Sequence, residues 1–128
     1  MRKWASCFLA LVLLISLSLP ALAAESEAQE AAQTLYELGL FQGTGTDAAG
    51  KPAFDLERAP SRAEAVTMLV RLLGKEREAL AGDWNTPFTD VADWAKPYVG
   101  YAYANSLTAG VSQTRFGGEN SVTAAQFL

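Results

Sequence analysis

The chain has 128 residues, half of them hydrophobic, and a formal net charge of −4 at pH 7. This acidic balance argues against nucleic-acid binding, which needs a basic surface. The chain contains no histidine, so the commonest general base and the commonest metal ligand are both missing. We therefore expect no catalysis, no metal site and no cofactor.

Residues 1–24 have the pattern of a secretory signal peptide. Arg2-Lys3 gives the positive start, an apolar run over residues 8–19 follows, and Ala21-Leu22-Ala23 predicts cleavage after residue 23 or 24. The apolar run is shorter than the ~20 residues of a membrane-spanning helix, so we expect no stable membrane span after cleavage. Cys7 is the only cysteine and would leave with this segment, so the mature chain would have no disulfide.

Two amphipathic helices are predicted in the first half of the mature chain. Apolar residues recur at three- and four-residue spacing over residues 25–38, and Gly39 is suited to end that helix in the left-handed conformation. A loop rich in glycine, threonine and alanine follows over residues 43–51. Ser61 and Glu64 form a capping box that opens the second helix.

The chain then continues through a charged connector over residues 75–85, which we expect to begin as a helical extension. Gly74 is the predicted stop or bend before it, and Pro87 marks its end. Short extended pieces are expected at Ala53-Phe54 and Arg115-Phe116.

The second half of the mature chain repeats the first, with a loop insertion in the first copy. Each copy has a small-hydrophobic-x-x-Gly turn, an aromatic residue after a loop, and a hydroxyl-x-x-Glu/Gln capping box. The corresponding segments are Leu40–Gly43 and Leu107–Gly110, Phe54–Glu57 and Phe116–Glu119, and Ser61–Glu64 and Thr123–Gln126.

The second copy opens with Phe88-Thr89-Asp90-Val91, followed by Trp94-Ala95. Together with the glycine turn, the later aromatic and the capping box, this pattern resembles the S-layer homology motif, which tethers bacterial surface proteins to cell-wall glycan. The box of the second copy lacks the arginine and the glutamate, whereas Ser61-Arg62-Ala63-Glu64 has both. The first copy in turn has no Phe-x-Asp-Val or tryptophan.

The resemblance implies a mainly α fold built from repeated helix–loop–helix motifs. We expect a first, N-terminally incomplete motif over residues 25–81, a linker over residues 82–87, and a second motif over residues 88–128 with a truncated last helix. Three such motifs usually form a bundle with pseudo-threefold symmetry, so this set would be incomplete.

The resemblance also implies a non-catalytic module that binds secondary cell-wall polysaccharide, such as a glycan with pyruvylated amino sugars. An indole can stack on a sugar ring, an arginine can pair with a ketal carboxylate, and an aspartate can accept hydrogen bonds from hydroxyls or hold a loop through backbone amides. A glycine lets the backbone approach a ligand. The candidate glycan-binding residues are Arg62, Asp90, Trp94, Gly110 and Gly43.

Each of these residues also has a structural interpretation. Trp94 could pack in the core, and Asp90 could cap the turn before a helix. Arg62 could be simply exposed to solvent at the start of its helix, and the two glycines could serve only their turns. Asp90 and Asp93 together suggest turn and cap residues more than a glycosidase pair.

The expected location is the bacterial cell surface or cell wall, after secretion. The expected partner is cell-wall glycan linked to peptidoglycan, with self-association through the motifs as a further option. Two alternatives stay open: a helical protein-interaction module without glycan binding, and a truncated fragment of a longer S-layer protein, since Leu128 falls about one turn into the last predicted helix.

Overall fold

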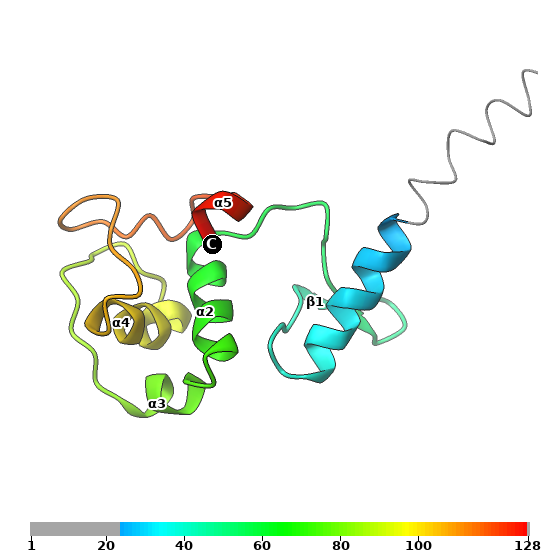
Figure 1. The fold of residues 1–128 in the computed structure, drawn as a ribbon, viewed down its shortest axis with the longest axis horizontal. Helices are drawn as coiled ribbons and strands as arrows, with labels where there is room; N and C mark the ends of the chain where they lie inside the picture. The colour runs from blue at the N-terminus through cyan, green and yellow to red at the C-terminus, as the bar shows by residue number, and fades with distance from the viewer. Residues whose placement is uncertain (1–23, 128) are drawn as a thin grey trace, which may run out of the picture. The chain divides into compact units, whose positions relative to one another are not determined.

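The computed structural model describes residues 24–127 of the chain (Figure 1). The predicted signal peptide, apart from Ala24, lies outside the described residues. Within them the secondary structure is mainly helical with one two-stranded sheet, which confirms the predicted α class. No helix in this part of the chain is long and apolar enough to cross a membrane.

The chain divides into two compact units. Unit 1 contains the described residues up to Leu38 and residues 42–56, and unit 2 contains residues 39–41 and 57–128. Each unit is described by itself.

Unit 1 consists of a helix and a short hairpin. The helix covers residues 24–37, close to the predicted range, and Gly39 after it has a φ of +72° as expected for a helix end. Strands β1 (Gly45–Thr46) and β2 (Pro52–Ala53) pair antiparallel, with Gly45 opposite Ala53. The segment predicted as a loop over residues 43–51 therefore contains β1 and the turn of a small hairpin, and the extended piece expected at Ala53-Phe54 overlaps β2.

The turn of this hairpin is held by Asp47. Its Oδ1 accepts hydrogen bonds from the N–H groups of Ala49 and Lys51, at 2.8 and 2.9 Å. After β2 the chain buries Phe54, whose ring meets the ring of Tyr36 edge-on at 6.0 Å. Phe54 thereby anchors the hairpin to the helix.

In unit 2, α2 (Arg62–Leu72) begins at the predicted capping box. The N–H of Glu64 donates to Ser61 Oγ at 3.3 Å, and the N–H of Ser61 donates to Glu64 Oε2 at 2.7 Å. Leu73 caps the end of the helix, and Gly74 follows with a φ of +67°. Both the start and the stop predicted for this helix are confirmed.

The rest of unit 2 is a series of short helices. They are α3 (Glu76–Ala81), the 3-10 helix η1 (Asp93–Ala95), α4 (Lys96–Ala104) and α5 (Ala124–Phe127). The charged connector thus contains a helix of its own, separated from α2 by the Gly74 turn. The extended piece expected at Arg115-Phe116 is wrong, because no strand forms there. The N–H and carbonyl of Phe116 bond to side chains, and the carbonyl of Arg115 accepts from the N–H groups of Val111 and Ser112.

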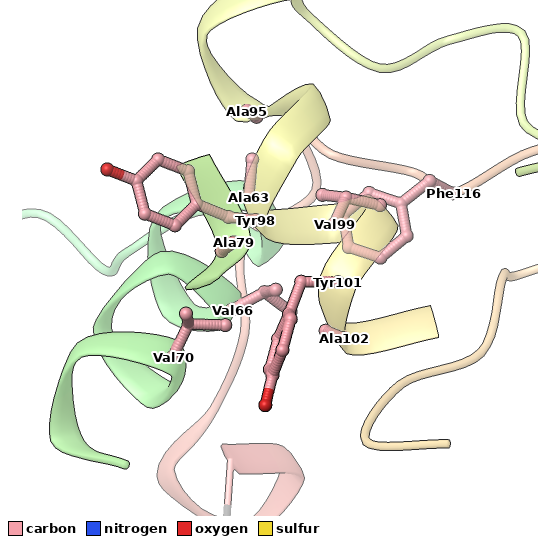
Figure 2. Packing of buried hydrophobic residues seen from close by; sticks show 10 residues of the cluster. All are labelled: Ala63, Val66, Val70, Ala79, Ala95, Tyr98, Val99, Tyr101, Ala102 and Phe116. Atoms are coloured by element: carbon pink, nitrogen blue, oxygen red, sulfur yellow. The ribbon is translucent and has the colours of Figure 1, made fainter. Parts of the chain in front are cut away.

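The core of unit 2 lies where α2, α3, η1 and α4 meet (Figure 2). Val70, Val99 and Phe116 are its largest fully buried side chains. Phe116 comes from the loop after α4, so the loop is anchored in the same core as the helices. The cluster consists of Ala63, Val66, Val70, Ala79, Ala95, Tyr98, Val99, Tyr101, Ala102 and Phe116.

Trp84 ties the segment after α3 to α4. Its Nε1–H donates to the carbonyl oxygen of Ala79 at 2.8 Å, and its ring meets the ring of Tyr101 edge-on at 5.3 Å. A Cβ at Gly100 would collide with Trp84, so a glycine is needed on α4 for this approach. The sequence alone does not indicate this role, because Trp84 belongs to no periodic pattern.

Candidate functional site

The loop over residues 109–118 is the centre of the candidate site, and Asp90 holds one side of it. The Asp90 carboxylate accepts hydrogen bonds from the N–H groups of Phe116 and Gly117, at 2.7 and 3.0 Å. Arg115 Nε lies 3.6 Å from the same carboxylate. These contacts, the bond from Phe116 above all, hold the pKa of Asp90 below its usual value. Asp90 therefore holds the loop through backbone amides.

Arg62 holds the other side of this loop. Its Nε donates to the carbonyl oxygen of Phe116 at 3.1 Å, and its Nη2 donates to the carbonyl oxygen of Ala109 at 2.7 Å. The guanidinium carbon lies 5.0 Å from the centre of the Phe116 ring, within the range of a cation–π contact. A guanidinium has five N–H donors, so these two bonds leave donors for a ligand.

Gly110 is required by close packing within the loop. A Cβ there would collide with the ring of Phe88 and with the carbonyl oxygens of Ser112 and Arg115. Gly43, in unit 1, has a φ of +71°, and a Cβ there would collide with the carbonyl oxygen of Ala53. The turn interpretation therefore accounts for the glycine at both positions.

Trp94 is exposed at the surface of unit 2. It lies in η1, and 52% of its surface is accessible. The interpretation of Trp94 as a core residue is therefore wrong; the neighbouring Ala95 is the buried residue of η1. Half of an indole surface is open to stack against a flat apolar ligand surface.

Asp93 has a different environment from Asp90. Its carboxylate pairs with Lys96 at 2.6 Å and is almost fully exposed. The N-cap of η1 is Ala92, with no side-chain cap hydrogen bond, so the expectation that these aspartates cap the helix is wrong. Within residues 24–127 no group of three or more acidic, cysteine or histidine side chains is placed to hold a metal ion.

A small hollow of about 80 Å³ opens beside Arg62. Arg62 is the single charged residue that lines it, with Thr108 and Gln126 as polar neighbours. Its other walls come from α2, from Leu107, from Val122 and from α5, and they are apolar: Ala65, Val66, Leu69, Leu107, Val122 and Phe127. A wider, open hollow of about 670 Å³ lies over residues 103–109 and shares Leu107 and Thr108 with it.

The structure thus brings three of the five predicted residues to one loop. Arg62 and Asp90 bind the loop over residues 109–118, and Gly110 lies within it. Trp94 lies on η1, and Gly43 belongs to unit 1. Sequence reasoning missed Thr108, which lines both hollows. Its place inside the Leu107–Gly110 turn is the one signal in the sequence that could have indicated it.

Comparisons with known proteins point to the same part of the chain. The S-layer homology domain model matches residues 87–128. Over 98% of its length the chain is similar to a surface layer protein of Brevibacillus choshinensis, at 30% identity, and to a middle cell wall protein of Brevibacillus brevis, at 28% identity. It spans 12% and 13% of the length of these two relatives. No solved structure matches the chain significantly.

The matched segment contains Asp90, Trp94, Gly110 and the loop that ends in the buried Phe116. Both relatives are named for the cell envelope. The chain therefore carries an S-layer homology domain over residues 87–128 and is a secreted protein of the bacterial cell surface or cell wall.

Proposed function

We propose that this chain is a non-catalytic anchoring module that binds secondary cell-wall polysaccharide and so holds a surface protein on the bacterial wall. The observation that carries the proposal is the exposure of Trp94, at 52%, on a helix of the matched domain. An exposed indole can stack its apolar face on a sugar ring while its edge stays in water.

Arg62 gives the proposed site its preference for a charged sugar. It is the single cation in the wall of the 80 Å³ hollow, and its planar guanidinium suits a carboxylate such as that of a pyruvate ketal. Thr108 adds a hydroxyl that can donate to or accept from a sugar. In this proposal Asp90 and Gly110 shape the loop, and Gly43 has the corresponding turn role in the first motif.

We also propose that residues 25–81 and 88–128 are two copies of the motif, joined by residues 82–87. Two pairs of backbone angles support this. Gly39 and Ser106 follow the ends of the corresponding helices with φ of +72° and +58°, and Asp55 and Gly117 follow the corresponding phenylalanines with φ of +48° and +71°. Matched positions thus share an uncommon conformation.

The test is co-sedimentation of the mature chain with purified cell walls before and after hydrofluoric acid removes the secondary polymer. We expect binding to native walls and its loss on stripped walls. Trp94→Ala should weaken binding by about tenfold or more, as expected for the loss of one stacking contact of ~1–3 kcal/mol, without a change in thermal stability.

Leu80→Ala is a suitable control, because Leu80 is exposed to a similar extent, at 56%, and lies on α3 of the same unit. It should leave both wall binding and stability unchanged. Equal binding to stripped and native walls would refute the glycan proposal.

A second candidate function is a protein-interaction module. It is favoured by three leucines exposed by about half around the Gly74 turn, namely Leu72, Leu73 and Leu80. If the wall assay fails while Leu72→Ser with Leu73→Ser abolishes assembly measured by analytical ultracentrifugation, this second function would replace the first.

A further inference from the structure

A buried guanidinium joins three helices of unit 2. The Arg71 side chain, near the end of α2, is only 9% exposed, and its Nε lies 2.8 Å from Glu76 Oε1 at the start of α3. Tyr98 on α4 donates its hydroxyl to the same carboxylate oxygen at 2.7 Å and accepts from Arg71 Nη2 at 3.3 Å. Glu76 is thus the point at which α2, α3 and α4 are connected by polar contacts.

Helix α3 has little apolar attachment of its own. Ala79 is its one residue in the buried cluster, and Leu80 is mostly exposed. In Figure 1 α3 lies at the C-terminal end of α2, next to α4, and its contacts with both helices agree with this. By contrast, α2 and α4 share Val66, Val70, Val99 and Ala102 in the buried cluster. The contacts of α3 therefore depend on polar groups far more than those between α2 and α4.

We propose that Glu76 is an acid-sensitive latch, whose protonation releases α3 from α2 and α4 while these two helices stay packed. An arginine stays charged at any ordinary pH. Once Glu76 is neutral, Arg71 loses the counter-charge that lies 2.8 Å from its Nε and keeps the hydroxyl and the ring of Tyr98 as neighbours. A buried charge that loses its counter-charge is strongly destabilising, and release of α3 lets water reach it.

The surroundings of Glu76 fix the direction of the pH effect. Arg71 on α2 and Tyr98 on α4 face its carboxylate. Other charged groups on these helices are paired with each other: Glu78 on α3 pairs with Lys75 at 2.9 Å, and Asp93 on η1 pairs with Lys96 on α4. The bond from Arg71, followed by that from Tyr98, holds the pKa of Glu76 below its usual value. Its contribution to stability is therefore complete above the unfolded pKa of about 4.3 and disappears as the pH falls through the lower folded pKa.

The test compares hydrogen-exchange protection of α3 and α4 in the mature chain between pH 7 and pH 2.5. The reporters are the N–H of Ala79, bonded to Lys75, and the N–H of Asn105, bonded to Tyr101. Protection of Ala79 should fall at least tenfold at a pH where Asn105 is still protected. In a Trp94→Phe background, fluorescence of Trp84 should change with Ala79, because its indole bonds to the carbonyl of Ala79.

Glu76→Gln should lower the protection of Ala79 at pH 7 at least tenfold and abolish its acid step. Glu78→Gln is the matched control on the same helix, since Glu78 forms an exposed pair with Lys75, and it should keep the acid step. Joint loss of protection at Ala79 and Asn105 at every pH, or an unchanged acid step in Glu76→Gln, would overturn the proposal.

Discussion

Two loops of this chain share one sequence pattern, a glycine turn followed by a buried phenylalanine, and they are held in different ways. In unit 1 the loop from Gly43 to Phe54 is a hairpin with strands β1 and β2, and its turn is held by Asp47 from within the loop. In unit 2 the loop from Gly110 to Phe116 forms no strand. Both phenylalanines are buried, Phe54 at 5% exposure and Phe116 at 0%.

The second loop depends on side chains from elsewhere in the chain. Asp90 binds the N–H of Phe116, and Arg62, at the start of α2, binds the carbonyl of the same residue. This loop also has bonds of its own, from the N–H groups of Val111 and Ser112 to the carbonyl oxygen of Arg115. The N–H and carbonyl of Phe116, however, are bonded by side chains of other elements. The shorter loop is therefore coupled to the segment before η1 and to α2, from which Arg62 lines the hollow of the proposed glycan site.

The largest effect is expected from removing the anchor of the second loop. Phe116→Ala should destabilise unit 2 by about 3–5 kcal/mol, since a fully buried phenylalanine leaves a large cavity. The mutation should also abolish wall binding, because Asp90 and Arg62 both hold the backbone of this residue. Urea denaturation followed by circular dichroism measures the loss of stability.

Phe54→Ala is the matched change in the first loop. It should produce a cavity cost in the same range but confined to unit 1, seen as faster hydrogen exchange in the 24–37 helix. If Phe54→Ala also removes protection throughout α2 and α4, the two loops are not the independent anchors that this comparison suggests.

A smaller effect is expected at Gly110. Gly110→Ala should cost about 1–3 kcal/mol, since the added methyl group meets the Phe88 ring and two backbone carbonyls that cannot move aside freely. Gly118→Ala is the control, because a Cβ there would make only ordinary contacts, the nearest at 3.5 Å. It should stay within about 0.5 kcal/mol of the wild type. Thermal melts of both variants measure whether Gly110 is required because a Cβ at this position has no room.

The variant Asp90→Asn tests whether the Asp90 carboxylate holds the loop from Gly110 to Phe116 against the segment before η1. Because its pKa is lowered by the Phe116 and Gly117 amides, its stabilising effect is present above the unfolded pKa of about 3.9 and lost as the pH falls through the lower folded pKa. Asp90→Asn should therefore lower the melting temperature at pH 7 and bring the two proteins together near pH 2. A difference that persists unchanged at pH 2 would mean that the charge is not what holds the loop.

Local signals predicted the helical parts of the fold well. The Ser61 box, the Gly39 stop and the Gly74 stop all depend on neighbouring residues, so they could be found in the sequence and are confirmed. The sequence indicates an extended piece near β2 but not its pairing with β1, because the two strands have two residues each, too few for an alternating pattern.

The candidate site could be predicted only in part, since the roles within it depend on long-range contacts. The resemblance to a known motif indicated Arg62 and Asp90, but their bonds to Phe116 span 54 and 26 residues along the chain. No local pattern reveals such a contact. The exposure of Trp94 was equally open, because an indole after a turn suits a core or a surface.

The smallest effect on stability is expected at the residue that follows the 24–37 helix in the first motif and α4 in the second. Gly39 and Ser106 both have positive φ, +72° and +58°, but only glycine adopts this conformation without a steric cost. Ser106→Gly should therefore stabilise unit 2 by about 0.5–1 kcal/mol, and Gly39→Ala should destabilise the chain by roughly 1 kcal/mol. Ser106→Ala is the control that keeps a Cβ and should give no gain. If Ser106→Gly lowers the melting temperature, the Ser106 hydroxyl contributes more than the backbone conformation costs, and the two helix ends are equivalent in geometry but not in energy.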